Sequence, residues 1–277
     1  MREIRKYILV GLVAVLSAVL LVGLFFLMRP MEEETPAETT QPTEAATEAT
    51  TLPPPTENVF TPLDFGYEDG YLTCLTAPSI RGIDVSAYQE TVDWEQVKAS
   101  GVEFVIIRLG YRGYSAGTMS ADSCAQSHYE GAKAVGLKVG AYFFSQAITP
   151  QEAVEEAEFA MELAKDWELD MPLAFDWEYI SPEARTGFVD ARLLTDISKA
   201  FCETVEAAGH ETMIYFNPEQ SEKQMHLEEL TEYGFWLAMY TDHMDYEYKV
   251  DMWQYTHTGA VPGIEGNVDI NLFFPYE

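Results

Sequence analysis

From residue 80 onward, short apolar segments alternate with segments of helical character, and this alternation constrains the fold more than any other feature. Strands are predicted at residues 80–85, 104–109, 138–144, 172–178 and 212–216. Helices are predicted between them at 94–100, 120–135, 150–165 and 191–208. Three more strands follow, with little helix between them, at 235–240, 252–255 and 268–272. Strands that alternate with helices form a parallel sheet, because each helix returns the chain across the face of the sheet.

These eight strands predict an α/β fold that closes into a barrel, with helices after the early strands and bare connections after the late ones. An open, doubly wound parallel sheet is the structural alternative. No glycine-rich phosphate loop follows the first predicted strand, which argues against the nucleotide-binding form of that sheet. We therefore expect a TIM-like barrel over residues 80–277.

The N-terminus has the pattern of a membrane anchor. Arg2, Arg5 and Lys6 precede an uninterrupted apolar stretch at residues 7–28, which is long enough to cross a bilayer as a helix. It is longer than the apolar part of most cleaved signal peptides, and no small-residue cleavage site is obvious at its end. Residues 1–30 are therefore predicted to be a signal anchor that spans the cell membrane once, with the rest of the chain outside the cell. Cleavage and release of the domain is the alternative.

The segment after the anchor does not have the composition of a folded domain. Residues 31–58 consist mostly of Thr, Pro, Glu and Ala without apolar periodicity, which predicts a disordered linker that acts as a stalk. Residues 59–79 mix aromatic and turn residues, and we expect them to lie against the barrel as a lead-in segment.

The chain is strongly acidic, with a net charge of −30. Residues 59–277 alone carry 12 Lys and Arg against 38 Asp and Glu, a net charge of −26. Such a surface repels nucleic acid, so we expect no nucleic-acid partner. The three cysteines and five histidines show no spacing typical of metal ligands, and we predict neither a metal nor a cofactor. The cysteines are expected to be unpaired, with one disulfide between two of them as the alternative.

Two acids, Asp176 and Glu178, follow the apolar start of the fourth predicted strand. Side chains alternate along a strand, so these two point the same way, roughly 6–7 Å apart. Like charges this close raise the proton affinity of one carboxyl group, which can then act as a general acid. Acid pairs of this kind cleave glycosidic bonds. The alternative is that both acids cap a helix or face water.

Polar and aromatic residues also lie at the ends of the other predicted strands. In a parallel barrel, functional side chains gather at the carboxyl ends of the strands. Two further acids lie on such strands, Asp84 at the end of the first and Asp269 on the eighth. The predicted substrate contacts are Tyr88, Arg108, Tyr142, Phe144, Tyr215, Asn217, Trp236, Tyr240, Trp253 and Gln254. Aromatic rings stack on the C–H faces of sugars, and acids and amides bind hydroxyl groups, so the set as a whole favours a sugar site. Each aromatic residue taken singly also fits core packing.

Seven segments together resemble, in their order and spacing, the Chalaropsis-type lysozymes of glycoside hydrolase family 25. They lie at residues 81–89, 106–111, 140–147, 175–178, 214–217, 236–240 and 252–271. The resemblance covers about residues 80–275 and implies a (β/α)5(β)3 barrel. It also implies cleavage of the β-1,4 bond between N-acetylmuramic acid and N-acetylglucosamine in peptidoglycan.

The resemblance assigns the general acid to Glu178, with Asp176 as its neighbour, and matches Asp84 and Asp269 to the two other acids of the family site. The family often carries a small aliphatic residue between the paired acids, whereas this chain has Trp177, which we expect to point away from the site into the helix layer. Asp176 is expected to stabilise a substrate-assisted intermediate, with direct inversion as the alternative.

Two other functions remain compatible with the sequence, namely a non-catalytic module that binds cell-wall glycan and a hydrolase of a chitin-like polymer. The expected partners are peptidoglycan strands and, through the N-terminal helix, the membrane. We expect the chain to be a monomer.

Overall fold

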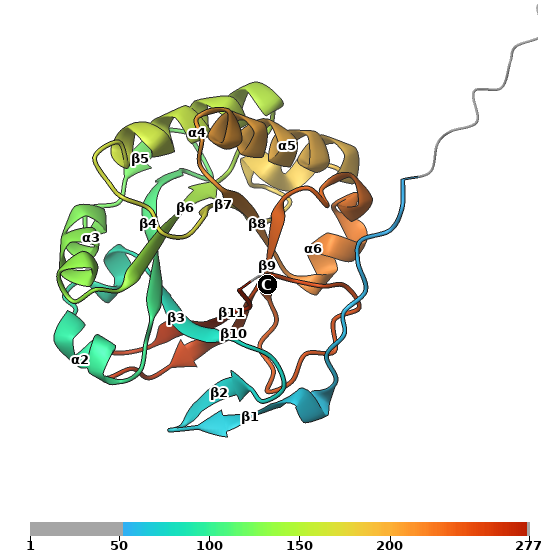
Figure 1. Cartoon of the computed structure of the whole chain (residues 1–277). Helices are drawn as coiled ribbons and strands as arrows, with labels where there is room; N and C mark the ends of the chain where they lie inside the picture. Colours follow the sequence, from blue (N-terminus) through green and yellow to red (C-terminus); the bar gives the residue numbers. More distant parts are fainter. Residues whose placement is uncertain (1–51, 276–277) are drawn as a thin grey trace, which may run out of the picture. The chain divides into compact units, whose positions relative to one another are not determined.

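The computed structural model describes residues 52–275, in which eight strands close into a barrel (Figure 1). The strands are β3 (Ile80–Val85), β4 (Phe104–Arg112), β6 (Lys138–Ser145), β7 (Leu173–Trp177), β8 (Thr212–Phe216), β9 (Gly234–Ala238), β10 (Met252–Gly259) and β11 (Val268–Phe273). Neighbouring strands from β3 to β10 pair in parallel. The last strand, β11, runs antiparallel between β10 and β3 and closes the ring. The expected barrel is confirmed, and the open sheet is wrong.

A helix follows each of the first five barrel strands. These helices are α2 (Trp94–Ala99), α3 (Ala125–Ala134), α4 (Pro150–Leu163), α5 (Ala191–Ala207) and α6 (Pro218–Lys223). Short 3-10 helices lie in the connections at Pro62–Asp64, Ala87–Gln89, Arg185–Phe188 and Leu227–Glu229. The order is thus five strand–helix units and then three strands.

Two elements differ from the sequence prediction. The strand β5 (Met119–Ala121) pairs antiparallel with the end of β4, where the sequence predicted the start of a helix. The helix α6 was not predicted because its six residues include no apolar side chain that would mark a buried face, unlike α2 of the same length. Its start is nevertheless encoded: the Asn217 side chain caps the helix, Pro218 fills its first turn, and Gln220 completes a capping box.

Large apolar side chains fill the interior of the barrel below the carboxyl ends of the strands. Phe104, Ile106, Met213 and Met252 belong to this interior cluster. Gly82 makes room for one of them, because a Cβ atom at Gly82 would lie 2.3 Å from the Phe104 ring. The interior is therefore a packed core, and only the last side chain of each strand can reach solvent at the upper edge.

Alternate side chains of the same strands point outward into the helix layer. On β7, Phe175 packs against Phe201 of α5 with 4.8 Å between the ring centroids. Trp177 is buried in the same layer, and its indole Nε1 donates to the Ala147 carbonyl at 2.9 Å. The expectation that Trp177 points away from the site is confirmed, which leaves the inward face of β7 to Asp176.

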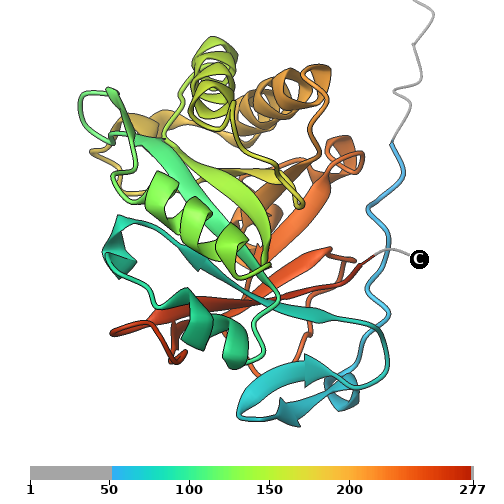
Figure 2. The same cartoon turned by 60° about the vertical axis from the view of Figure 1, so that its left-hand side comes forward.

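A β-hairpin covers the side of the barrel that has no helix. It consists of β1 (Phe65–Glu68) and β2 (Tyr71–Cys74) and lies beside β10 and β11 (Figures 1 and 2). Phe65 packs on Trp253 of β10 with 5.1 Å between the ring centroids, and Leu72 is fully buried. The lead-in segment therefore takes the place that a helix holds beside the first five strands.

The ordered domain begins before residue 59. The Glu57 backbone forms a β-bridge with Tyr248, and the Asn58 amide donates to the Glu247 carbonyl at 2.9 Å. The predicted disordered linker, residues 31–58, thus overlaps the folded domain at its C-terminal end, because its last residues have backbone partners.

The predicted membrane helix at residues 7–28 lies outside the described residues. Between residues 52 and 275, none of the helices combines the length and apolar character needed to cross a bilayer. All three cysteines fall in this part of the chain, and each is a free thiol.

Candidate active site

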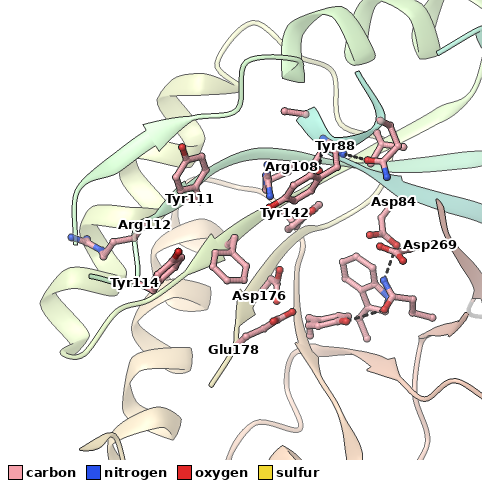
Figure 3. Close-up of a pocket in the computed structure, with 18 of the residues that line it drawn as sticks. Asp84, Tyr88, Arg108, Tyr111, Arg112, Tyr114, Tyr142, Asp176, Glu178 and Asp269 are labelled. Atoms are coloured by element: carbon pink, nitrogen blue, oxygen red, sulfur yellow. Dashed lines mark hydrogen bonds between the residues drawn. The ribbon is translucent and has the colours of Figure 1, made fainter. Parts of the chain in front are cut away.

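The carboxyl ends of the barrel strands surround a cleft of about 720 Å³, here called the main cleft (Figure 3). All four predicted acids line it, namely Asp84, Asp176, Glu178 and Asp269. Seven of the predicted substrate contacts line it as well, namely Tyr88, Arg108, Tyr142, Phe144, Tyr215, Trp236 and Gln254. Strand alternation combined with closure of the barrel thus brings residues from all eight barrel strands, and from the connections after β3 and β7, to a single opening.

Asp84 is the centre of a hydrogen-bond network at the floor of the main cleft. Its Oδ2 accepts hydrogen bonds from Gln254 Nε2 and Asn271 Nδ2, both at 2.8 Å. The Gln254 side-chain oxygen accepts from the Tyr215 and Tyr240 hydroxyls at 2.8 and 3.1 Å. These contacts fix the Gln254 amide with its nitrogen toward Asp84, and the Trp236 indole Nε1 fixes the Asn271 amide in the same way by donating to Asn271 Oδ1 at 2.8 Å.

A second acid, Asp269, lies directly opposite Asp84 in the pairing of β11 with β3. The two carboxyl groups are joined by a side-chain hydrogen bond. Burial and then the Asp269 charge raise the pKa of Asp84 well above its usual range, although two amide donors oppose the rise. Burial also raises the pKa of Asp269. One proton shared by the two groups removes the repulsion that like charges on adjacent strands otherwise cause.

The other acids, Asp176 and Glu178, project side by side from the end of β7 (Figure 3). Asp176 is only 6% exposed, and its Oδ1 has no hydrogen-bond partner among the described residues. Burial, followed by the Glu178 charge, raises the pKa of Asp176 well above its usual range. The pKa of Glu178 is also raised, first by burial and then by the charge on Asp84. The pair can therefore hold a proton near neutral pH.

Arg108 and Tyr88 form one wall of the main cleft. The Arg108 guanidinium binds Asp122 through Nε and Nη2, each at 2.8 Å, and lies over the Tyr88 ring at 5.3 Å. Asp122 also accepts from the Ala87 amide at 3.0 Å, which fixes the loop that carries Tyr88. Tyr88 itself is 84% exposed, so its ring can lie against a ligand at the entrance.

The end of β6 supports the loop that follows Glu178. Gln146 Nε2 donates to the Glu178 carbonyl at 2.8 Å. Beneath it, Glu156 of α4 accepts from the Ser145 hydroxyl and from Arg112 Nε. Burial raises the pKa of Glu156 to about 7, although Ser145 and Arg112 oppose the rise. These contacts tie α4, β4 and β6 to the backbone of Glu178.

Three predicted substrate contacts lie outside the main cleft. Asn217 and Tyr240 line a neighbouring side cleft, which shares Glu178 and Tyr215 with the main cleft. The prediction for Trp253 is wrong, because this side chain is fully buried beneath the hairpin, and its indole Nε1 donates to the Met239 carbonyl. Neighbouring residues of a strand face opposite sides, so Trp253 and Gln254 cannot both enter the cleft.

Three residues of the site were not singled out from the sequence. They are Asp122, which orients Arg108, and Arg112 and Tyr114, which line the main cleft. Tyr111 and Asn271 lie at the ends of predicted strands, and the structure places Tyr111 in the lining of the main cleft and Asn271 on Asp84. The loop positions carry no comparable periodic signal.

Paired acids and aromatic side chains at the carboxyl edge of a barrel are typical of the active site of a glycoside hydrolase. The sequence agrees, since residues 83–264 match the family described as "Glycosyl hydrolases family 25". This match covers more than half of the 277 residues, and the chain belongs to that family. In the part of the chain that the structure describes, no group of three or more acids, histidines or cysteines is arranged to hold a metal ion.

Known proteins of this fold support the assignment. An autolytic lysozyme of Clostridium acetobutylicum is 28% identical over 197 residues, which are 70% of this chain and 56% of that protein. The modular autolysin LytC of Streptococcus pneumoniae has a TM-score of 0.64 at 24% identity, over 76% of this chain and 52% of LytC. A family 25 glycosyl hydrolase from Bacillus anthracis has a TM-score of 0.60 at 21% identity, over 72% of this chain and 90% of that protein. The chain thus spans about half the length of the autolytic lysozyme and of LytC.

The raised pKa of Asp176 predicts a stability cost at neutral pH. A carboxyl group whose folded-state pKa is raised stabilises the fold below its unfolded-state pKa, and this contribution is lost as pH rises through the folded-state value. Asp176→Asn cannot ionise and should therefore melt above wild type at pH 7, by about 2–4 °C for each kcal/mol recovered, with the difference shrinking toward pH 4. Differential scanning calorimetry between pH 4 and 8 measures this.

The exposed Asp245→Asn is the control for that experiment, and its melting temperature should follow wild type at every pH. A lower melting temperature for Asp176→Asn at pH 7 would contradict the assigned direction.

Proposed function

We propose that the chain is a lysozyme that hydrolyses peptidoglycan at the β-1,4 bond between N-acetylmuramic acid and N-acetylglucosamine. Membership of glycosyl hydrolases family 25 supports a glycosidic substrate. A relative is named an autolytic lysozyme, and LytC has been solved with a synthetic peptidoglycan ligand. The acid cluster and the aromatic walls of the main cleft are compatible with such a substrate.

The unpartnered oxygen of Asp176 is the observation that carries this proposal. A buried polar atom without a partner is costly unless a ligand satisfies it. Asp176 lines the main cleft beside Glu178, and no described residue donates to its buried Oδ1. A 2-acetamido sugar in the cleft offers an N–H group for the Asp176 carboxyl group, whereas a sugar without that group does not.

In the proposed mechanism, Glu178 donates its proton to the glycosidic oxygen as the bond to C1 breaks. The acetamido carbonyl oxygen of the same sugar attacks C1 and forms a cyclic oxazolinium ion, whose N–H faces the Asp176 carboxylate. Water then attacks C1 and gives its proton to Glu178, which restores the starting state. Asp84 and Asp269 hold the floor of the cleft and bind sugar hydroxyls.

Changing Glu178 to Gln should lower kcat on purified peptidoglycan by about 10²–10⁴-fold, because the amide cannot donate a proton to the leaving oxygen. The measurement is release of reducing ends from dye-labelled cell walls. Glu183→Gln, an exposed acid that lines none of the clefts described here, is the control and should retain wild-type rates. A Glu178→Gln enzyme near the wild-type rate would disprove the acid assignment.

The same assay separates the proposal from its two alternatives. A wall-binding module would bind peptidoglycan without releasing reducing ends. A hydrolase of chitin-like polymers would release them faster from chitin fragments than from cell walls.

The first-formed sugar anomer tests the role of Asp176. Attack by the acetamido group followed by attack of water inverts C1 twice, so we expect the β-anomer first. Proton NMR during the first minutes of digestion, before mutarotation, detects it. An α-anomer as the first product means direct displacement by water and excludes the oxazolinium route.

The proposal also includes a cell-surface location. The apolar stretch at residues 7–28, preceded by three basic residues, supports a single-pass anchor with the barrel outside the cell. The full chain should therefore remain with membranes after alkaline carbonate washing, and a chain that starts at residue 31 should be soluble. Full-length chain found in the wash would refute an anchor, and a shortened chain in the medium would indicate cleavage.

A further inference from the structure

A second cleft, of about 620 Å³, lies between the N-terminal hairpin and the carboxyl end of β10, and it is here called the outer cleft. The hairpin contributes Tyr67, Gly70 and Tyr71 to it. The barrel contributes Tyr240 and the segment that runs from Tyr255 to Ala260. The hairpin lies before residue 83, where the family match begins, so three of the thirteen residues that line this cleft precede the matched domain.

Tyr67 lines the outer cleft on the hairpin side. Residues that face each other in an antiparallel pair share one face of the hairpin, and Tyr67 is opposite Leu72. Leu72 is fully buried against the barrel, as is most of Phe65 two residues before Tyr67. Tyr67 nevertheless is 64% exposed, because the cleft lies where barrel side chains would otherwise cover its ring.

The outer cleft and the main cleft have no lining residue in common, but the side cleft shares residues with both. The side cleft shares Glu178 and Tyr215 with the main cleft and shares Tyr240 with the outer cleft. Tyr240 is 50% exposed, its hydroxyl donates to Gln254, and its ring packs on His257 at 4.3 Å. One aromatic residue thus links the acid network to the outer cleft.

The chemistry of the lining suits a neutral sugar polymer. The lining combines tyrosine rings with the hydroxyl groups of Thr241, Thr256 and Thr258. It contains no Lys or Arg, and its acid is Asp242. An anionic wall polymer or a carboxylate-bearing peptide would find no cation there, whereas a sugar can stack on the rings and hydrogen-bond to the hydroxyl groups.

We propose that the outer cleft binds further sugar units of the same glycan strand that occupies the main cleft, so that the enzyme holds a strand across the barrel and onto the N-terminal hairpin. This inference rests on the proposed lysozyme function. It adds a glycan-binding role for the hairpin, which strengthens binding of long strands and leaves binding of short fragments unchanged.

Dissociation constants for two ligands test the proposal, namely long glycan strands whose lactyl carboxyl groups are capped as simple amides and a tetrasaccharide capped in the same way, so that both ligands are neutral. Both are measured by calorimetry in a Glu178→Gln background, where turnover is slow. Tyr67→Ala should weaken binding of long strands by about three- to tenfold, as expected for loss of one stacked ring. Binding of the tetrasaccharide should not change. Phe188→Ala is the control, because Phe188 is equally exposed at 66% and lines none of these clefts.

Each other outcome overturns the inference. Equal affinity of Tyr67→Ala and Phe188→Ala for long strands means that no sugar reaches the hairpin. Equal weakening for both ligands means that Tyr67 supports the fold. Weakening only for peptide-bearing strands means that the outer cleft binds the peptide. Cleavage of cell walls by the enzyme with Glu178 intact tests the lysozyme proposal separately, so the two can fail independently.

Discussion

Four carboxyl groups meet in one cleft, and the cost of burying them, to which their mutual repulsion adds, governs the rest of the site. Charges of one sign interact strongly at low dielectric, and a buried carboxylate needs a cation, a donor or a proton. The cations in the lining of the main cleft are Arg108 and Arg112, which bind Asp122 and Glu156. Protons are the remaining means of relief, and the pKa values of all four acids are raised. The acids of the barrel thus bind protons tightly at the place where a glycosidic oxygen is to be protonated.

The two acid pairs differ because the sheet presents them differently. Asp84 and Asp269 are direct neighbours on adjacent strands, close enough for a hydrogen bond that one proton can satisfy. Asp176 lies on β7 and Glu178 directly follows the end of that strand, and Asp176 Oδ1 has no partner among the described residues. Asp84 and Asp269 are thus suited to holding the floor of the cleft in place, and Asp176 and Glu178 are suited to taking part in the reaction.

Much of the barrel followed from the sequence because strand periodicity is a local property. The alternation at 173–178 placed Asp176 and Glu178 inward and Trp177 outward, and the structure agrees for Asp176 and Trp177. The same rule, applied to Trp253 and Gln254, would have rejected Trp253. The missed features depend on contacts between distant segments. Asp122 contributes to the site because it accepts hydrogen bonds from Arg108 and from the Ala87 amide. The residues next to Asp122 in the sequence give no sign of these contacts. The short helix α6 has no apolar residue to mark its buried face, whereas α2, of the same length, has Trp94 and Val97; only the cap of α6 was visible in the sequence.

The hairpin has a practical consequence for where this protein can be cut. The match to the family begins at residue 83, yet Trp253 and other outward side chains of β10 and β11 are covered by residues 60–74. A recombinant fragment that starts at the family boundary would expose this apolar surface to solvent and would tend to self-associate. The smallest sensible expression unit therefore starts near Thr56, where backbone pairing with the segment around Lys249 begins.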